Sequence, residues 1–486
     1  MYKHTTVKKS LILLVAALLC VAVVLSACGP KTHQAVSIPD KIEQEQIESN
    51  GGIAVKYGDW IYYVNGYQSS ANAENTYVDT TDAPRVGSIV RINAAKVGDA
   101  VGISVEDGKT SSVKTKEIAE LVRENAQIVI PRIYYTANTT TPELNGIWIY
   151  NDRIFILTPD DQLTAGGNKQ TSQAVLMSYN LGGGDEQRHF TFTSNSAQVW
   201  LYKQGDDVMA TYLMSSELHV LKVGANEKAS VDTLIADEDA ENKTVSSVSF
   251  DVNAGSVFYI DVNGSICKLD KGSTTPVVLV KNDSKKGDEN TITYTIKSVC
   301  NGCVYYTVAD KENPDLNNVK LYYVSADSTE GSVAFDSADI DVYGYKDGKV
   351  VVVRPSTTNS SFYGLYLITS ADGKESTCLL QPGFNKATIT INKIVGDELY
   401  YTSNSVTYVK KLNQDVDATV HGELYASGWS TSASVGWAAP DIVKVGNVTY
   451  MFTLSTNSVS VVKLNTEKKN NSSPATVLTL TVPDEK

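Results

Sequence analysis

A short unit recurs along this chain and limits what it can fold into. In residues 394–413, IVGDELYYTSNSVTYVKKLN, it consists of a strand, a Gly-Asp turn, a strand with paired tyrosines, a second turn and another strand. Related segments occur at 57–63, 300–306, 346–351 and 445–450. Glycine next to Asp or Asn supplies the positive φ of tight hairpin turns, so each segment predicts a β-hairpin.

The spacing of these segments predicts repeated four-stranded blades. We take one anchor in each strongly apolar strand, namely Tyr62, Phe155, Leu201, Tyr259, Tyr305, Val351, Tyr400 and Tyr450. Six of the seven separations lie between 46 and 58 residues, close to the roughly 40 to 50 residues of a propeller blade. A chain of 486 residues also exceeds what one core normally supports. We therefore expect an all-β protein in which residues 51–486 form a β-propeller of eight blades, with seven as the alternative.

The tyrosine content favours a propeller over a β-sandwich. The chain has 27 tyrosines and 9 phenylalanines, and pairs such as Tyr400-Tyr401 place one ring on each face of a strand because side chains alternate. A sandwich covers one face of each sheet, whereas neighbouring blades cover both. We further expect the last strand, residues 477–482, to pair with the first segment and to close the ring without a free sheet edge.

The one long interval between anchors contains an insertion at residues 94–125. Its second half, 114–124, predicts a helix, because Ile118, Leu121 and Val122 share one helical face. We expect this helix to cover apolar surface at the edge of the first blade, and a helix that binds a partner is the alternative.

The amino terminus predicts export. Residues 1–10 contain three lysines and no acidic residue, and residues 11–25 are uncharged and apolar, as in a secretory signal peptide. The apolar run is shorter than the roughly 20 residues that span a bilayer. The following Leu25-Ser26-Ala27-Cys28 resembles the lipobox of bacterial lipoproteins. This resemblance implies that residues 1–27 are removed and that Cys28 carries the lipid.

The segment after this cysteine, residues 28–50, is polar and contains Pro30 and Pro39, a composition typical of a flexible tether. We therefore expect a protein anchored to the bacterial cell membrane through the lipid on Cys28, with its folded part on the extracytoplasmic side. The net charge of −13 and the absence of a dense Lys/Arg run argue against nucleic acid as a partner.

Strong catalytic and cofactor motifs are absent from the sequence. It contains no H-E-x-x-H, no G-x-S-x-G and no phosphate-binding glycine loop before a helix. The histidines of the mature chain, His33, His189, His219 and His421, lie in separate segments. We interpret the acidic residues of 336–341 as solvated loop residues, because they do not match a calcium loop. We therefore assign no catalytic residue, metal or cofactor.

Cys300 and Cys303 form a C-x-x-C motif, but a strand follows it, whereas a thioredoxin-like motif must begin a helix. The Asn301-Gly302 turn instead predicts a hairpin with the two cysteines opposite each other. Three interpretations remain open: a local disulfide, two reduced structural cysteines, or redox or zinc chemistry together with Cys267 and Cys378.

Residues 428–437 differ from the repeats, because Trp429 and Trp437 flank a run of small polar residues. Exposed rings in such a loop could stack on a sugar or peptide ligand. The alternative is that both rings pack between blades.

The unit Tyr400-Tyr401-Thr402-Ser403 is similar to the Tyr-Trp-Thr-Asp repeats of low-density-lipoprotein-receptor-type propellers. Most of residues 50–482 resembles the lipid-anchored propeller proteins of Gram-positive bacteria, whose function is generally unassigned. We expect a module that binds a protein or glycan at the cell surface. The alternative is a glycan-processing enzyme of the cell envelope with carboxylates in the propeller cleft. Residues 94–125 and 428–437 depart from the repeat, so function is expected there.

Overall fold

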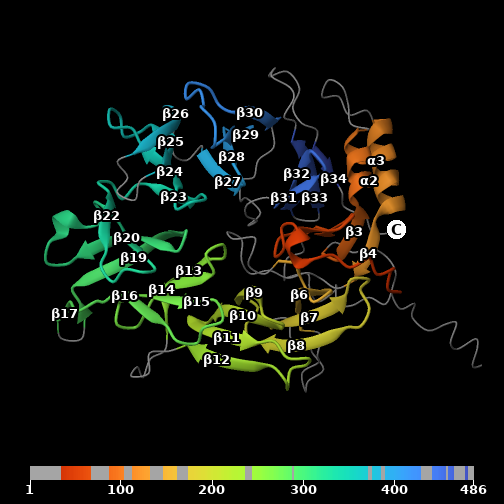
Figure 1. The fold of residues 1–486 in the computed structure, drawn as a ribbon, viewed down its shortest axis with the longest axis horizontal. Coiled ribbons are helices and arrows are strands. Elements are labelled where there is room, and N and C mark those ends of the chain that lie inside the picture. Colours follow the sequence, from red (N-terminus) through yellow and green to blue (C-terminus); the bar gives the residue numbers. More distant parts are fainter. Residues whose placement is uncertain are drawn as a thin grey trace, which may run out of the picture.

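Eight four-stranded antiparallel sheets form the body of the molecule and are arranged as the blades of a disc (Figure 1). The computed structural model describes residues 34–66, 87–102, 112–131, 146–160, 173–235, 244–286, 289–369, 375–384, 389–404, 406–427, 441–455, 458–464 and 477–479. Each blade is contiguous in sequence, and its strands follow chain order. The predicted all-β, eight-bladed propeller is confirmed.

The first four blades contain the following strands. Blade 1 has β1 (Ala54–Tyr57), β2 (Trp60–Val64), β3 (Ile89–Asn93) and β4 (Gln127–Ile130), and blade 2 has β5 (Trp148–Tyr150), β6 (Arg153–Pro159), β7 (Ala174–Asn180) and β8 (Gln187–Phe192). Blade 3 has β9 (Gln198–Gln204), β10 (Asp207–Met214), β11 (Glu217–Lys222) and β12 (Val231–Ile235), and blade 4 has β13 (Ser246–Asp251), β14 (Ser256–Ile260), β15 (Ile266–Asp270) and β16 (Val277–Val280).

The remaining blades continue in the same order. Blade 5 has β19 (Ile292–Cys300), β20 (Cys303–Asp310), β21 (Leu321–Ser325) and β22 (Ser332–Phe335), and blade 6 has β23 (Asp341–Gly344), β24 (Val350–Pro355), β25 (Tyr363–Ile368) and β26 (Ser376–Phe384). Blade 7 has β27 (Ile389–Val395), β28 (Glu398–Ser403), β29 (Val406–Lys411) and β30 (Glu423–Ser427), and blade 8 has β31 (Asp441–Val445), β32 (Val448–Ser455), β33 (Ser458–Leu464) and β34 (Val477–Thr479). Outside the blades lie the small hairpin β17 (Lys285–Lys286) and β18 (Glu289–Asn290) and the short helices η1 (Gln44–Gln46) and η4 (Pro314–Leu316).

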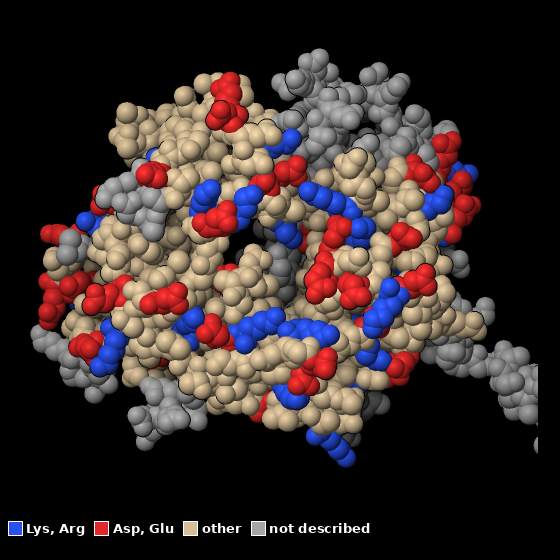
Figure 2. Space-filling view, viewed as in Figure 1, with Lys and Arg blue, Asp and Glu red and all other residues tan. Residues whose placement is uncertain are grey.

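The first strand of each blade lies nearest the axis, and the fourth lies at the rim (Figure 1). Because successive strands are antiparallel, the loops leave the disc on two sides. Turns from first to second strands and from third to fourth strands form one side, which we name the turn face. Loops from second to third strands and from one blade to the next form the other side, which we name the connection face. Figure 2 shows a hollow at the centre of the disc, with acidic and basic side chains interspersed around it.

The Gly-Asp and Asn-Gly pairs lie in the first hairpin turn of the blades, as predicted. Gly58, Gly396 and Gly446 have φ near 60°, as the first position of a type II′ turn requires. Both residues of Asn301-Gly302 have positive φ, as in a type I′ turn.

The polar residues at and beside these turns also connect neighbouring blades. The bonds are Tyr57 Oη to Asp152 Oδ1 (3.1 Å), Asn151 Nδ2 to the Asp206 carbonyl (3.1 Å), Gly302 N to Asp251 Oδ2 (2.9 Å), Asn301 Nδ2 to the Lys349 carbonyl (2.8 Å) and Tyr345 Oη to Asp397 Oδ1 (2.5 Å). The repeated turn therefore has two roles, since it reverses the chain and links one blade to the next.

Paired tyrosines fill the interfaces between blades. Tyr62, Tyr63, Tyr400 and Tyr401 are fully buried, and Tyr401 belongs to a cluster that joins residues of blades 6 and 7. This confirms that both faces of the second strands are covered. Seven of the eight anchors lie on the second strand of their blade, and Leu201 lies on the first strand of blade 3, β9.

Two helices pack beside blade 1: α2 (Ala94–Gly102) and α3 (Ser112–Asn125) (Figure 1). In the sequence they lie between β3 and β4. Val97 of α2 and Val122 of α3 are buried in the cluster that joins blades 1, 2 and 8. The predicted helix and its role in covering apolar surface are confirmed. Helix α2 was not predicted, because Gly98 and Gly102 weaken its helical pattern.

The ring does not close through strand exchange. The last strand, β34, pairs with β33 at the rim of blade 8, so the expected pairing of 477–482 with the first segment is wrong. The inner strands β1 and β31 instead lie in contact, and Asp441 of β31 accepts hydrogen bonds from the backbone N–H groups of Ile53 and Ala54. Each blade supplies its own four strands, so none of the blade strands in the described part of the chain is exchanged.

The segment before blade 1 lies against the propeller. A flexible tether was expected over residues 28–50, but its described part, 34–50, makes defined contacts with three blades. Val36 N donates to the Gly182 carbonyl of blade 2 (2.9 Å), and Ser49 Oγ donates to the Ile442 carbonyl of blade 8 (2.9 Å). Ile42 packs against the cluster around blade 1. A few apolar side chains and backbone bonds therefore hold a segment that is polar in composition.

Candidate functional site

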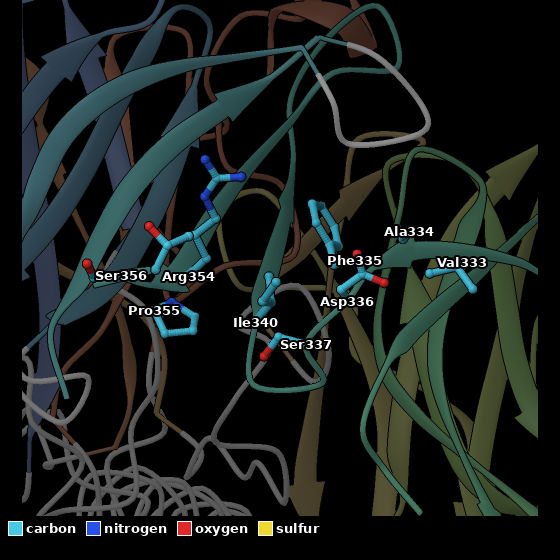
Figure 3. Close-up of a pocket in the computed structure, with 10 residues that line it drawn as sticks. Val333, Ala334, Phe335, Asp336, Ser337, Ile340, Arg354, Pro355 and Ser356 are labelled. Carbon is cyan, nitrogen blue, oxygen red and sulfur yellow. The ribbon is translucent and has the colours of Figure 1, made fainter. Parts of the chain in front are cut away.

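A pocket of about 650 Å³ lies on the connection face between blades 5 and 6, within the range of roughly 300–1,000 Å³ typical of small-ligand sites. One side comes from the end of β24 and the loop after it, and the other comes from β22 and the loop that leads to β23. The lining residues are Val333, Ala334, Phe335, Asp336, Ser337, Ile340, Arg354, Pro355, Ser356 and Thr357. Figure 3 shows Arg354, Pro355 and Ser356 on one side, Phe335, Asp336 and Val333 on the other, and Ile340 between them.

Arg354 is the cation of the pocket. Its guanidinium carbon lies 3.8 Å from the centre of the Tyr366 ring, a cation–π contact that orients the planar group. Nη2 also lies 3.4 Å from Ser376 Oγ. Arg354 forms no ion pair with any acidic residue of the described chain.

Asp336 is the pocket's carboxylate, and it is directed to solvent. Its side chain is 90% exposed and lies 3.5 Å from Lys320 Nζ. Asp339, from the same acidic run, accepts a hydrogen bond from the Tyr363 hydroxyl. The acidic residues of 336–341 were interpreted as solvated loop residues; Asp336 is solvated but borders a pocket, and Asp339 is bonded to a neighbouring strand.

The loop from β24 to β25 is ordered by its own hydrogen bonds. Ser356 N donates to the Phe362 carbonyl (2.7 Å), and Ser356 Oγ lies 2.9 Å from Thr358 Oγ1. Because these bonds use the short polar side chains that the sequence places there, the loop presents Arg354 and Ser356 in a fixed arrangement.

A serine–histidine contact in blade 2 was not foreseen. Ser178 Oγ lies 2.7 Å from His189 Nε2, and His189 Nδ1 lies 2.6 Å from the Gly224 carbonyl. The distances fit a nucleophile and its base, but Ser178 is fully buried and accepts a hydrogen bond from Arg153 Nε (2.9 Å). The pair therefore stabilises the fold and is closed to substrate.

His219 and His421 are likewise held by neighbouring side chains. His219 Nδ1 lies 3.1 Å from Asp232 Oδ2 in blade 3, and its ring stacks on Tyr212. His421 Nδ1 lies 3.0 Å from Tyr401 Oη in blade 7. No group of three or more His, Cys, Asp and Glu residues suited to a metal ion occurs within the described ranges.

Cys300 and Cys303 lie directly opposite each other on β19 and β20, as predicted, and both are free thiols in the structure. Burial, with a contribution from the Asp251 carboxylate, raises the pKa of both thiols. A redox C-x-x-C needs the opposite shift. Cys267 on β15 and Cys378 on β26 lie in blades 4 and 6, so the four cysteines do not form one site.

Three residues singled out from the sequence, Cys28, Trp429 and Trp437, lie outside the described residues. No helix in the part of the chain that the structure describes is long and apolar enough to cross a membrane. The pocket itself had no sequence signal, because its two sides come from separate loops of ordinary composition.

No protein-family model and no curated protein sequence matches this chain. Among solved structures it is similar to BamB from Moraxella catarrhalis, with 13% identity and a TM-score of 0.36 over 90% of this chain and 99% of BamB. It is also similar to YCF48 bound to D1 peptide, with 8% identity and a TM-score of 0.32 over 68% of this chain and 93% of that one. Both are β-propeller proteins.

A puromycin-hydrolyzing peptidase from Mycobacterium tuberculosis is similar at 8% identity and a TM-score of 0.38, over 87% of this chain. The present chain spans 60% of the length of that peptidase. At these identities and TM-scores, none of the three similarities assigns a function to this chain.

Proposed function

We propose that this chain is a lipid-anchored, extracytoplasmic β-propeller that binds a protein or glycan ligand on its connection face. The pocket between blades 5 and 6 carries the proposal. It combines an apolar wall with a few polar groups, the composition of a ligand site, and it lies on the face where the loops between blades converge.

The proposed location rests on the leader and on the lipobox-like Leu25-Ser26-Ala27-Cys28, and on the resemblance to the lipid-anchored propellers of Gram-positive bacteria. Two or three acyl chains on Cys28 would hold the protein stably at a membrane. We expect Cys28→Ala to shift the protein from the membrane fraction to the soluble or secreted fraction and to abolish the mass added by the lipid. Unchanged membrane fractionation, with no mass difference between the variant and the natural chain, would contradict the anchor.

Binding at the connection face is tested with a photo-crosslinking amino acid in intact cells. We place it at Thr357, an exposed residue at the pocket, and at Asn447, an exposed residue of the turn face, as the matched control. The proposal expects a defined crosslinked protein or glycan from position 357 and none from position 447. Equal products from both positions, or none from position 357, would contradict it.

An enzyme would behave differently. Incubation of the purified chain with cell-wall and polysaccharide substrates should give binding without turnover. Hydrolysis that a single Asp or Glu substitution abolishes would replace the binding module with a glycan-processing enzyme.

A further inference from the structure

The pocket between blades 5 and 6 holds a cation, Arg354, that no acidic residue of the described chain neutralises. Arg354 is half-buried at the end of β24, where the Tyr366 ring and Ser376 Oγ position its guanidinium. Its fork of N–H donors matches the geometry of a carboxylate. Since no acidic residue of the described chain pairs with Arg354, these donors are available to an anion from outside.

Apolar surface lies next to this cation. Phe335 and Pro355 face each other across the pocket, and Ile340 lies between them (Figure 3). Val333, on the same side as Phe335, is 41% exposed. A ligand that reaches Arg354 through this pocket would therefore bury apolar groups against these side chains, which favours binding.

The Asp336 carboxylate does not neutralise the Arg354 guanidinium. The Asp336 side chain is 90% exposed and lies 3.5 Å from Lys320 Nζ. Arg354 instead lies over Tyr366 on the opposite side. Asp336 therefore disfavours a second negative charge at the entrance, while Arg354 favours one at its own side of the pocket.

From this arrangement we infer that the pocket binds a single carboxylate carried on an apolar body, with Arg354 as the carboxylate-binding residue. The inference rests on the proposed binding function and names its ligand class. Two sources have this chemistry: the C-terminus of a peptide that ends in an apolar residue, and a small aryl or alkyl carboxylic acid.

The test uses detergent-purified full-length protein and two matched probe pairs in titration calorimetry. One pair is acetyl-Gly-Gly-Phe as the free acid and as the C-terminal amide, and the other is 3-phenylpropionate and 3-phenylpropionamide. We expect at least one acid to bind roughly tenfold or more tightly than its amide, because a charge-assisted hydrogen bond is lost in the amide. If the tripeptide acid binds more tightly than 3-phenylpropionate, the ligand is a peptide C-terminus. If 3-phenylpropionate binds as tightly as the tripeptide acid, the ligand is a small carboxylic acid.

Variants locate the site. Arg354→Gln should remove the preference for the acid, and Arg354→Lys should keep part of it, because Lys retains the charge without the fork. Asp336→Asn should tighten the binding of the acid by roughly twofold to fivefold, as expected for the loss of one exposed like charge. Arg123→Gln, on the exposed face of α3, is the control for loss of a surface charge and should change nothing.

Equal binding of acid and amide, no binding of either acid, or an unchanged preference in Arg354→Gln would overturn the inference. Asp336→Asn keeps it falsifiable if Arg354→Gln fails to fold, because Asp336 is solvent-exposed and its substitution leaves the packing intact. A crosslinked ligand at Thr357 together with these negative results would reject the carboxylate and leave the binding module standing. No crosslink would reject the module itself.

Discussion

His189 is a buried histidine whose hydrogen bonds specify one protonation state. The Gly224 carbonyl can only accept, so Nδ1 carries the proton, and Nε2 accepts from the Ser178 hydroxyl. Ser178 Oγ in turn accepts from Arg153 Nε. A second proton on Nε2 would break the bond from Ser178 and place a charge near Arg153. Burial lowers the pKa of His189, and the charge of Arg153 adds to the decrease.

This shift predicts loss of stability in mild acid. Between the lowered folded pKa and the unfolded pKa of about 6.5, the unfolded chain binds more protons, so the free energy of unfolding rises with pH. As pH falls below about 6.5, we expect His189 to contribute a loss of up to about 1.4 kcal/mol per pH unit until the folded pKa is reached. Urea unfolding at pH 7.5, 6 and 5 measures it.

The matched variant is His189→Gln, which does not titrate. Burial also lowers the pKa of His421, so the variant should keep part of the slope and lose only the part that belongs to His189. Identical slopes in the natural chain and the variant would show that His189 is not held neutral.

Single residues differed in how well the sequence predicted them. The burial of Tyr62, Tyr63, Tyr400 and Tyr401 was predictable, because alternation along a strand is a local rule. The Ser178–His189 contact was not, because it depends on the register of β7 against β8, which shifts between Leu176 and Met177. Arg354 could not be predicted as a binding residue, because its role depends on which acidic side chains lie near it in the folded chain.

At the scale of the element, the first hairpin turn of each blade combines a local and a distant function. Asp397 accepts from the Tyr345 hydroxyl of blade 6 (2.5 Å) and from Asn413 Nδ2 (2.8 Å), and Lys346 Nζ contacts it. Asp59 occupies the same Gly-Asp position in blade 1, but its exposed side chain forms no hydrogen bond or ion pair within the described chain. Its backbone carbonyl accepts from Ala94 N (2.8 Å).

These two turns form a matched pair. Asp397→Ala should lower the midpoint of urea unfolding, because it removes the bonds from blade 6, whereas Asp59→Ala should leave the midpoint within error. Both substitutions keep the turn glycine and therefore the turn geometry. If both variants lost the same stability, the effect would belong to the turn itself and the inter-blade bond would contribute nothing.

Elements were predictable where the pattern was local and strong. The glycine-containing turns, the strands after them and α3 follow from positive φ, alternation and helical periodicity. Apolar character alone does not separate first from second strands, because Val199 to Tyr202 on the first strand of blade 3 is as apolar as the second strands elsewhere. In α2, Gly98 packs close to the Tyr450 hydroxyl of blade 8, so a packing requirement weakened the helical signal.

At the scale of the whole molecule, the number of blades follows from the repeat, but the closure of the ring does not. A repeat pattern states how often a unit occurs and leaves open how the last unit meets the first. Closure depends on Asp441 and on residues 48–54, which are far apart in sequence. The pocket between blades 5 and 6 also does not follow from the repeat pattern, since its two sides belong to different blades.

Asp441 is the residue that joins the ends of the ring. It is 1% exposed, its Oδ2 accepts from Ile53 N and Ala54 N, and its Oδ1 lies 3.3 Å from Lys393 Nζ of blade 7. One carboxylate thus connects blades 7, 8 and 1. A Cβ at Gly52 would overlap this carboxylate, which explains the glycine at that position.

We expect Asp441→Asn to lower the free energy of unfolding by about 1.5 to 3 kcal/mol, the usual contribution of a hydrogen bond to a charged group. Gly52→Ala should also destabilise, since its methyl group displaces the same carboxylate. Asp283→Asn, at an exposed pair with Lys281, serves as the control and should stay within about 0.5 kcal/mol. Urea unfolding measures the loss of free energy of unfolding. Limited proteolysis shows which residues become accessible first. If the ring closes at Asp441, the first cleavages in the variant fall in residues 34–53 and 441–455, because opening begins where blades 8 and 1 meet, and cleavage elsewhere would contradict this.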